Sequence, residues 1–163
     1  MEQIDQAKNS GTVYRHPTGI SFWYPADWQA QMLSGIMQLV PPGAGHSADT
    51  YETYFITAEN VAQYGITDPS HPDVLEYLEE QMQMLGQQLG VMFQRNGAAK
   101  KIATSQGNGI RVDWSAQSNY GLVKARTYVS IMNGYGMIFA GVGVKNLLER
   151  RDADISQIVS SFG

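Results

Sequence analysis

Apolar and polar residues alternate with a two-residue period in several parts of the chain, as they do in half-buried β-strands. In residues 18–24, Ile20, Phe22 and Tyr24 share one face, whereas Ser21 and Trp23 share the other. Alternation or strand-like composition predicts further strands at 12–16, 28–33, 36–40, 51–58, 101–105, 110–117, 123–132 and 135–144. Hairpin turns are expected at 34–35, at 106–109 with its Asn-Gly pair, and at 133–134.

Two segments have the three-to-four-residue spacing of helices. Residues 74–89 carry an apolar stripe, with Glu76, Glu79, Glu80, Gln83 and Gln87 on the opposite side. Ser70 is the predicted N-cap of this helix, and Gly90 is its predicted stop. A second helix is predicted from Asn146, which has the capping-box spacing to Glu149, through to Phe162.

This order of elements indicates an α+β domain, in which an antiparallel sheet is covered by two main helices. Residues 1–10 are polar and aperiodic, so we expect a flexible leader followed by a single domain over 11–163. Two prolines and two glycines make 41–47 a predicted loop.

Composition narrows the functional classes. A net charge of -4 and a pI near 5.2 argue against nucleic-acid binding. The absence of cysteine excludes disulfides, thiolate metal sites and cysteine nucleophiles. No apolar run is long enough for an integral membrane segment. The first six residues lack the pattern of a signal peptide, so the protein is expected to be either cytoplasmic or exported with its signal absent from this chain.

Catalytic and cofactor motifs are not found. His16, His46 and His71 lack metal-binding spacing, and Ser47 beside His46 lies in a loop without a Gly-x-Ser-x-Gly elbow. The segment 141–146 begins like a dinucleotide fingerprint but lacks its third glycine, so we interpret its two glycines as easing a sheet-to-helix crossing. We therefore predict no catalytic residue, no metal site and no cofactor.

Tyrosine and methionine point toward binding, because both are enriched at adaptable interfaces. The same residues also fill the space between a helix and a sheet, and that reading stays open. They are Tyr51, Tyr54, Tyr64, Tyr120, Tyr128 and Tyr135 with Phe55, and Met82, Met84, Met92, Met132 and Met137. A modest basic patch is possible on neighbouring strands, built from Lys100, Lys101, Arg111, Lys124 and Arg126.

Two short motifs carry a resemblance to a known family. An aromatic strand leading into Tyr24-Pro25-Ala26-Asp27-Trp28, and a closing helix that ends Ile158-Val159-Ser160-Ser161-Phe162, resemble the PsbP-like α/β/α sandwich. That family includes extrinsic photosystem II subunits, a Ran-binding transport factor and exported bacterial proteins. The resemblance implies a scaffold used mainly by binders and assembly factors, and fold alone does not fix function.

The leading hypothesis is a non-catalytic protein-interaction or assembly module, exported in a bacterium, with an unknown protein partner and a monomeric or weakly homo-oligomeric state. The alternative is a small-ligand or divalent-cation binder with a pocket between helix and sheet, near Trp28, Tyr51 or Trp114. The residues expected to form the ligand or partner surface are Tyr24, Trp28, Tyr51, Tyr54, Lys124, Arg126 and Tyr128.

Overall fold

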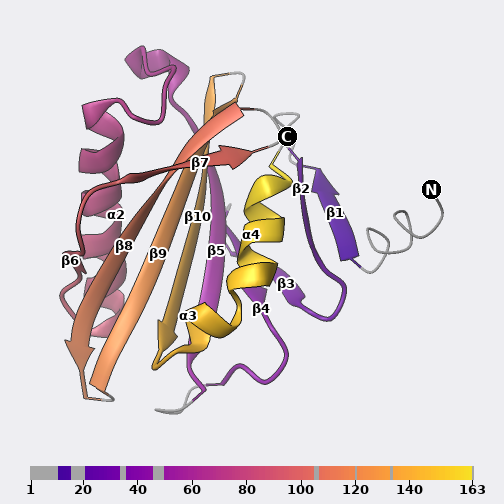
Figure 1. Ribbon diagram of the computed structural model, residues 1–163, viewed down its shortest axis with the longest axis vertical. Helices are drawn as coiled ribbons and strands as arrows, with labels where there is room; N and C mark the ends of the chain where they lie inside the picture. Colours follow the sequence, from indigo (N-terminus) through magenta and orange to yellow (C-terminus); the bar gives the residue numbers. More distant parts are fainter. Residues whose placement is uncertain are drawn as a thin grey trace.

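The computed structural model describes residues 11–15, 21–33, 36–45, 50–104, 107–119, 121–132 and 134–162 (Figure 1). Strands β1 (Gly11–Arg15) and β2 (Ser21–Pro25) form a hairpin of their own. The other described strands make one antiparallel sheet in the order β3-β4-β5-β10-β9-β8-β6, with β7 also paired to β8. Their bounds are β3 Gln29–Leu33, β4 Ile36–Val40, β5 Glu52–Asn60, β6 Gln94–Arg95, β7 Lys100–Thr104, β8 Gly107–Ser118, β9 Gly121–Met132 and β10 Tyr135–Val144.

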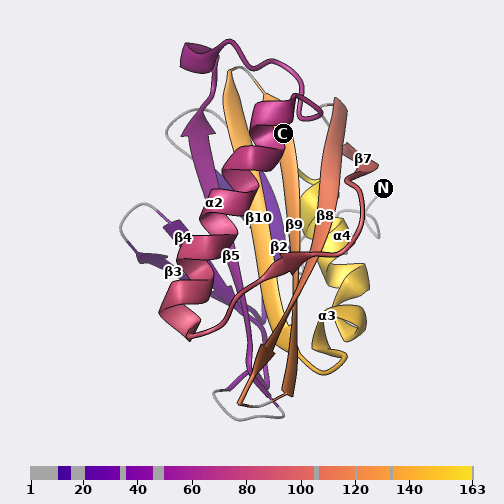
Figure 2. The same cartoon turned by 90° about the vertical axis from the view of Figure 1, so that its left-hand side faces the viewer.

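Helices cover both faces of this sheet, which makes a three-layer α+β sandwich. Helix α2 (Pro72–Leu89) crosses one face, and the short helix η1 (Ala62–Tyr64) precedes it (Figures 1 and 2). Helices α3 (Leu147–Arg150) and α4 (Asp152–Ser160) cover the other face, beside the β1–β2 hairpin. The predicted α+β architecture is confirmed.

The sheet separates two apolar clusters. Under α4, the aromatic residues Phe22, Trp28, Tyr54, Phe139 and Phe162 are buried together. Under α2, the cluster is mainly aliphatic and contains Leu78, Met82, Val112, Trp114 and Val142 among others. Side chains alternate along each central strand, so β10 contributes Phe139 to the first cluster and Val142 to the second. We call these the aromatic layer and the aliphatic layer.

Two of the three predicted hairpins have the expected register. Leu33 pairs with Ile36, and Met132 pairs with Tyr135. The third prediction is wrong, because Asn108 and Gly109 lie within β8, opposite Ala103 and Ile102. Gly109 serves close packing there: a Cβ at this position would lie 2.6 Å from the Val129 carbonyl oxygen. Residues 105–106, between β7 and β8, lie outside the described residues, and so do 34–35 and Asn133.

Both helix starts differ from the prediction. His71, not Ser70, caps α2, and its Nδ1 accepts a hydrogen bond from the Asp73 amide. The Ser70 hydroxyl instead donates to the Asp68 carboxylate. Gly90 ends α2 with a φ of 72°, as expected.

The predicted terminal helix is broken at Arg151, and Asn146 makes no side-chain cap. Helix α3 ends and α4 begins at Arg151, whose guanidinium is bound to Glu52 and to the Pro42 carbonyl. The interpretation of 141–146 is supported, because Gly141 and Gly143 lie in β10 where it passes beneath Leu148 and the start of α3.

Some of the predictions concern residues that the structure does not describe, and others concern features that were expected to be absent. The leader, His16, His46, Ser47 and Tyr120 are not described. Among the residues that are described, no helix has the length and apolarity needed to cross a membrane. In the same part of the chain, no group of three or more His, Asp or Glu side chains is arranged to hold a metal ion.

Candidate functional site

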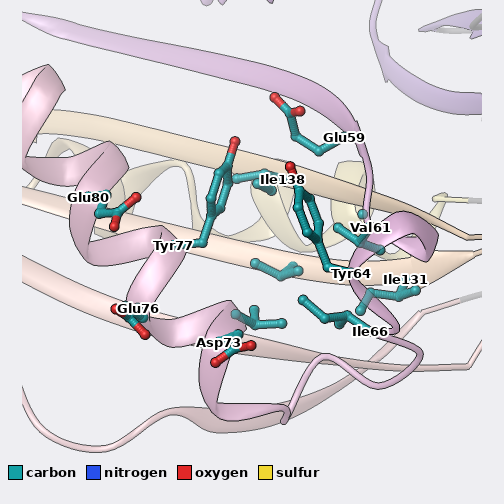
Figure 3. A pocket seen from close by; sticks show the side chains of 13 residues that line it. Glu59, Val61, Tyr64, Ile66, Asp73, Glu76, Tyr77, Glu80, Ile131 and Ile138 are labelled. Carbon is teal, nitrogen blue, oxygen red and sulfur yellow. The ribbon is translucent and has the colours of Figure 1, made fainter.

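A cavity of about 410 Å³ lies between the N-terminal half of α2 and the sheet, and we call it the α2 cavity (Figure 3). Strands β9 and β10 supply its floor, which consists of Val129, Ile131, Gly136 and Ile138. The end of β5 and the segment after it supply Glu59, Val61, Tyr64 and Ile66. Helix α2 closes the remaining side with Asp73, Val74, Glu76, Tyr77 and Glu80.

Two tyrosines form the walls of this cavity. The Tyr77 and Tyr64 rings stand on opposite sides, with Ile138 between them in the view (Figure 3). Tyr77 is half-buried, and its hydroxyl points toward the Glu59 carboxylate (Figure 3). Burial, reinforced by the Glu59 charge, raises the pKa of Tyr77 well above its ordinary value, so this phenol stays neutral at physiological pH. Tyr64 is 69% exposed, and its ring is held by η1 at the mouth.

All the charged side chains around the opening of the α2 cavity are carboxylates. Asp73, Glu76 and Glu80 lie on one flank of α2, because residues three and four apart share a helix face. Glu59 reaches the same opening from β5 (Figure 3). None of the lining residues is Lys, Arg or His, so the cavity combines an apolar floor with an acidic rim.

A second hollow, of about 170 Å³, lies between the C-terminal half of α2 and strands β4 and β5. We call it the α2–β5 groove. Its lining includes Ile36, Phe55, Met84 and Leu85, and it shares Ile138 with the α2 cavity. Met84 is 56% exposed and Ile36 is 39% exposed, so apolar side chains remain open to solvent where the helix does not cover the sheet.

The aromatic residues expected at a partner surface are mostly internal. Trp28, Tyr54 and Tyr128 are buried in the aromatic layer, so a partner cannot reach these rings in this conformation. The Trp28 and Tyr54 rings are 5.1 Å apart, and burial places the pKa of Tyr54 far above its ordinary value. Tyr24 is half-buried, with its ring 6.2 Å from that of Phe22.

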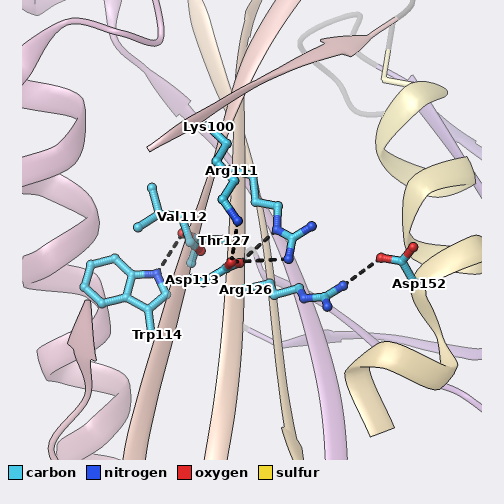
Figure 4. Close-up of polar contacts among 8 residues, drawn as sticks. All are labelled: Lys100, Arg111, Val112, Asp113, Trp114, Arg126, Thr127 and Asp152. Carbon is cyan, nitrogen blue, oxygen red and sulfur yellow. Dashed lines mark hydrogen bonds and ion pairs between the residues drawn. The ribbon is translucent and has the colours of Figure 1, made fainter. Parts of the chain in front are cut away.

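Four of the five expected basic residues each face an acid, and Figure 4 shows three of these four, Lys100, Arg111 and Arg126. The fifth, Lys101, is exposed. Arg111 and Lys100 meet Asp113 at 2.8 and 3.4 Å. Arg126 meets Asp152 of α4 at 2.8 Å. On α3, Glu149 pairs with Lys124 at 2.9 Å. The Lys124–Glu149 and Arg126–Asp152 pairs link α3 and α4 to the sheet, whereas the two Asp113 pairs lie within it. Together they leave little net positive charge for a partner.

Of the three positions where a pocket between helix and sheet was expected, only Tyr51 lies at a hollow, and the larger α2 cavity lies elsewhere. Trp28 and Trp114 belong to the packed core, and the indole Nε1 of Trp114 donates to the Thr127 hydroxyl at 3.0 Å (Figure 4). Tyr51 lines a separate hollow of about 90 Å³ with Leu89, Val91, Ser118, Val123 and Val144. None of the three expected residues lines the α2 cavity.

Sequence reasoning named Tyr64 among the tyrosines that favour binding but missed most residues that form the cavity. The spacing of Asp73, Glu76, Tyr77 and Glu80 is readable in the sequence as one helix flank. Of these, only Glu76 and Glu80 were singled out, as part of the side opposite the apolar stripe. Glu59 belongs to a different element, so its meeting with Tyr77 follows from the fold and has no local sequence signal.

Comparisons with known proteins concern the fold. No protein-family model matches the sequence, and neither does any curated protein. The solved structure of cyanobacterial PsbP (CyanoP) from Synechocystis sp. PCC 6803 aligns over 94% of this chain and 92% of its own, with a TM-score of 0.66 and 11% identity. The chain has the PsbP-like fold.

Other structures with the PsbP-like fold agree over the same length. The Saccharomyces cerevisiae Ran-binding protein Mog1p aligns over 94% of both chains, with a TM-score of 0.56 and 7% identity. LpqN of Mycobacterium tuberculosis, involved in cell envelope biogenesis, aligns over 93% of this chain and 88% of its own, with a TM-score of 0.57 and 17% identity. At these identities the likeness establishes the fold and leaves the function to the site.

Proposed function

We propose that this PsbP-like domain is a non-catalytic interaction module that binds a protein partner at the β3 edge of its sheet. Strand β3 ends the sheet order, and within the described residues it pairs only with β4. Its sequence, Gln-Ala-Gln-Met-Leu, contains no charge and no proline. An unpaired edge without such protection is a template for a further strand. This unprotected edge is the observation that carries the proposal.

The opposite edge of the sheet is built differently. Strands β6 and β7 carry Arg95, Lys100 and Lys101, all of them exposed. Charged residues, lysine above all, are how natural sheets prevent edge-to-edge pairing. The chain therefore protects one edge and leaves the other open (Figure 2).

The α2–β5 groove gives this edge a place for side chains. A partner strand added to β3 extends the sheet, and alternate side chains of that strand then lie on the same side of the sheet as the groove, separated from Ile36 of β4 by β3 itself. Methionine adapts its shape to different apolar partners. Mog1p, which shares the fold, is described as a Ran-binding protein, and this supports a protein-binding role for the scaffold.

The proposal is tested by photo-cross-linking in cells of the source organism. A cross-linking residue replaces Gln31 on β3 or, as the control, Gln87 on the exposed side of α2. We expect a specific product only from position 31, and expect Gln31→Lys to reduce complex formation with the identified protein. Equal products from both positions, or binding unaffected by Gln31→Lys, contradict the proposal. A product containing a second copy of this chain makes the partner a homo-oligomer and contradicts the hetero-partner form.

The alternative function, binding of a small ligand, is favoured by the α2 cavity. Its volume of about 410 Å³ is typical of ligand sites. The divalent-cation form of this alternative has less support, because the described residues contain no metal-binding group. An extracytoplasmic location also stays a proposal; the role of LpqN in cell envelope biogenesis supports it, and cell fractionation tests it.

A further inference from the structure

The α2 cavity has the size of a ligand site and a lining of one chemical character. Small-molecule sites are concave and mostly apolar, with a few polar groups that set specificity. Here the floor of Val129, Ile131 and Ile138 is apolar, and the charged groups at its rim are all acidic. An anionic ligand would meet only repulsion, so the rim selects for positive charge.

The aromatic walls strengthen that selection. The half-buried Tyr77 ring lines the cavity, with its hydroxyl directed toward Glu59 (Figure 3). Tyr64 stands across from it at the mouth of the cavity (Figure 3). Aromatic faces are electron-rich and attract cations, most effectively alkylated ammonium groups that carry little hydration.

The rim carboxylates are available to a ligand. Within the described part of the chain, the ion pairs of Glu79, Asp113, Glu149, Asp152 and Glu52 lie elsewhere. No such pair involves Glu59, Glu76 or Glu80, and Asp73 has only His71 at 3.9 Å. These carboxylates face outward around an apolar floor and do not converge as metal ligands do, in line with the absence of a metal group among the described residues.

We propose that the α2 cavity binds an organic cation: an ammonium or trimethylammonium group on an apolar body, held between Tyr64 and Tyr77 under the acidic rim. The charge balances Glu59, Glu76 and Glu80, and the body covers Ile131 and Ile138. No residue of β3 lines the α2 cavity, so this proposal can be tested independently of the proposed protein-binding role.

The test is an amide NMR titration of the full chain with choline and with its neutral isostere 3,3-dimethylbutan-1-ol. We expect choline to shift the amide signals of residues near 59, 64, 77 and 80, and to bind at least about fivefold more tightly than the isostere. Equal affinity for the two probes overturns the proposal, because shape alone then explains binding. Choline shifts located elsewhere, or no choline shifts at all, also overturn it.

Three variants tie the effect to the cavity. Tyr64→Leu removes one wall at a position that is largely exposed, so folding is preserved. Glu80→Gln removes one rim charge, and each change is expected to weaken choline binding about two- to fivefold. Glu79→Gln is the matched control, because Glu79 neighbours Glu80 on α2 but does not line the cavity. Equal weakening by Glu79→Gln indicates a general charge effect and overturns the proposal.

A second probe pair identifies the source of the cation. N-acetyl-lysine amide presents a lysine side chain, and N-acetyl-norleucine amide is its uncharged counterpart. Charge-dependent binding of the lysine compound at the same residues supports a cation carried by a protein. Binding of choline alone supports a free metabolite. Both outcomes fit the proposed site, whereas binding of the norleucine compound as tightly as the lysine compound contradicts it.

Discussion

Arg151 and Glu52 form an ion pair that joins the start of α4 to the first residue of β5, with 2.9 Å between Nη2 and Oε1. The Glu52 carboxylate is 4% exposed and also accepts a hydrogen bond from the Tyr54 hydroxyl at 2.8 Å. The same guanidinium donates to the Pro42 carbonyl at 2.8 Å and lies over the Trp28 ring. One side chain thus connects a loop, a strand, a helix and the aromatic layer.

Arg151→Met is expected to lower the free energy of unfolding by about 3 kcal/mol, because it leaves the Glu52 carboxylate buried without its partner. Glu52→Gln is expected to cost less, since no buried charge remains. Urea unfolding of both single variants and the double variant measures this. If the double variant loses the sum of the single losses, the two residues act independently and the prediction is wrong.

Two glycines of β10 are expected to respond differently to alanine. A Cβ at Gly141 would lie 2.7 Å from the Tyr54 ring, which is fully buried and cannot move away. A Cβ at Gly143 would meet Leu147 and Leu148 at ordinary distances of 3.4 to 3.5 Å. Gly141→Ala should therefore cost about 1 to 3 kcal/mol, as overpacked cores do, and Gly143→Ala much less. Thermal melts of the matched pair test the contrast, and equal losses contradict it.

Acid is expected to destabilise the protein through Asp113 and Glu149. Burial acts to raise the pKa of Asp113, but the hydrogen bond and charge of Arg111, with Lys100, outweigh it and hold this pKa below 3.8. Burial also acts to raise the pKa of Glu149, but the hydrogen bond from Lys124 outweighs burial, so this pKa lies below 4.5. These carboxylates therefore add to the free energy of unfolding at pH values above their ordinary pKa values. That contribution is lost as the pH falls below those pKa values.

Asp113→Asn should accordingly flatten the acid side of the stability curve. Urea midpoints measured from about pH 5 downward, through the ordinary carboxyl range, provide the comparison. Glu76→Gln, at an exposed position on α2 and in no ion pair among the described residues, is the control and should keep the slope of the unmodified protein. An Asp113→Asn protein with an unchanged slope would refute this assignment.

Alkali is expected to reveal four tyrosines that ionise late. Burial raises the pKa of Tyr51, Tyr54, Tyr77 and Tyr128 above the ordinary 10.0, and Glu52 and Glu59 add to this for Tyr54 and Tyr77. Because the raised pKa belongs to the folded state, their contribution to stability is complete below pH 10 and declines as pH rises further. Tyrosinate absorbance should therefore show two phases in native protein and one in urea. All nine tyrosines titrating together in native protein would contradict this.

The sequence was informative where a local pattern has one structural solution. The apolar stripe of 74–89 became α2 with the predicted stop at Gly90, and the register of Met132 and Tyr135 followed from their hairpin. Local signals failed where residues distant in the sequence meet. The terminal helix is divided at Arg151, whose guanidinium is bound to Glu52, 99 residues away. Gly109 lies in a strand, where a Cβ would meet the Val129 carbonyl oxygen. The α2 cavity is of this second kind, since Glu59 and Tyr77 meet only through the fold.

The separation of the interior into an aromatic and an aliphatic layer has a consequence for how such proteins diversify. The α2 cavity touches the aliphatic layer through Ile66, Val74 and Val129, and none of its lining residues belongs to the aromatic layer. Substitutions that retune the cavity therefore leave the packing of Trp28, Phe139 and Phe162 intact. Selection can alter recognition on one side of the sheet while architecture is conserved on the other. Structures that are only 7 to 17% identical to this chain have the same architecture, which is consistent with one layer being conserved while the other varies.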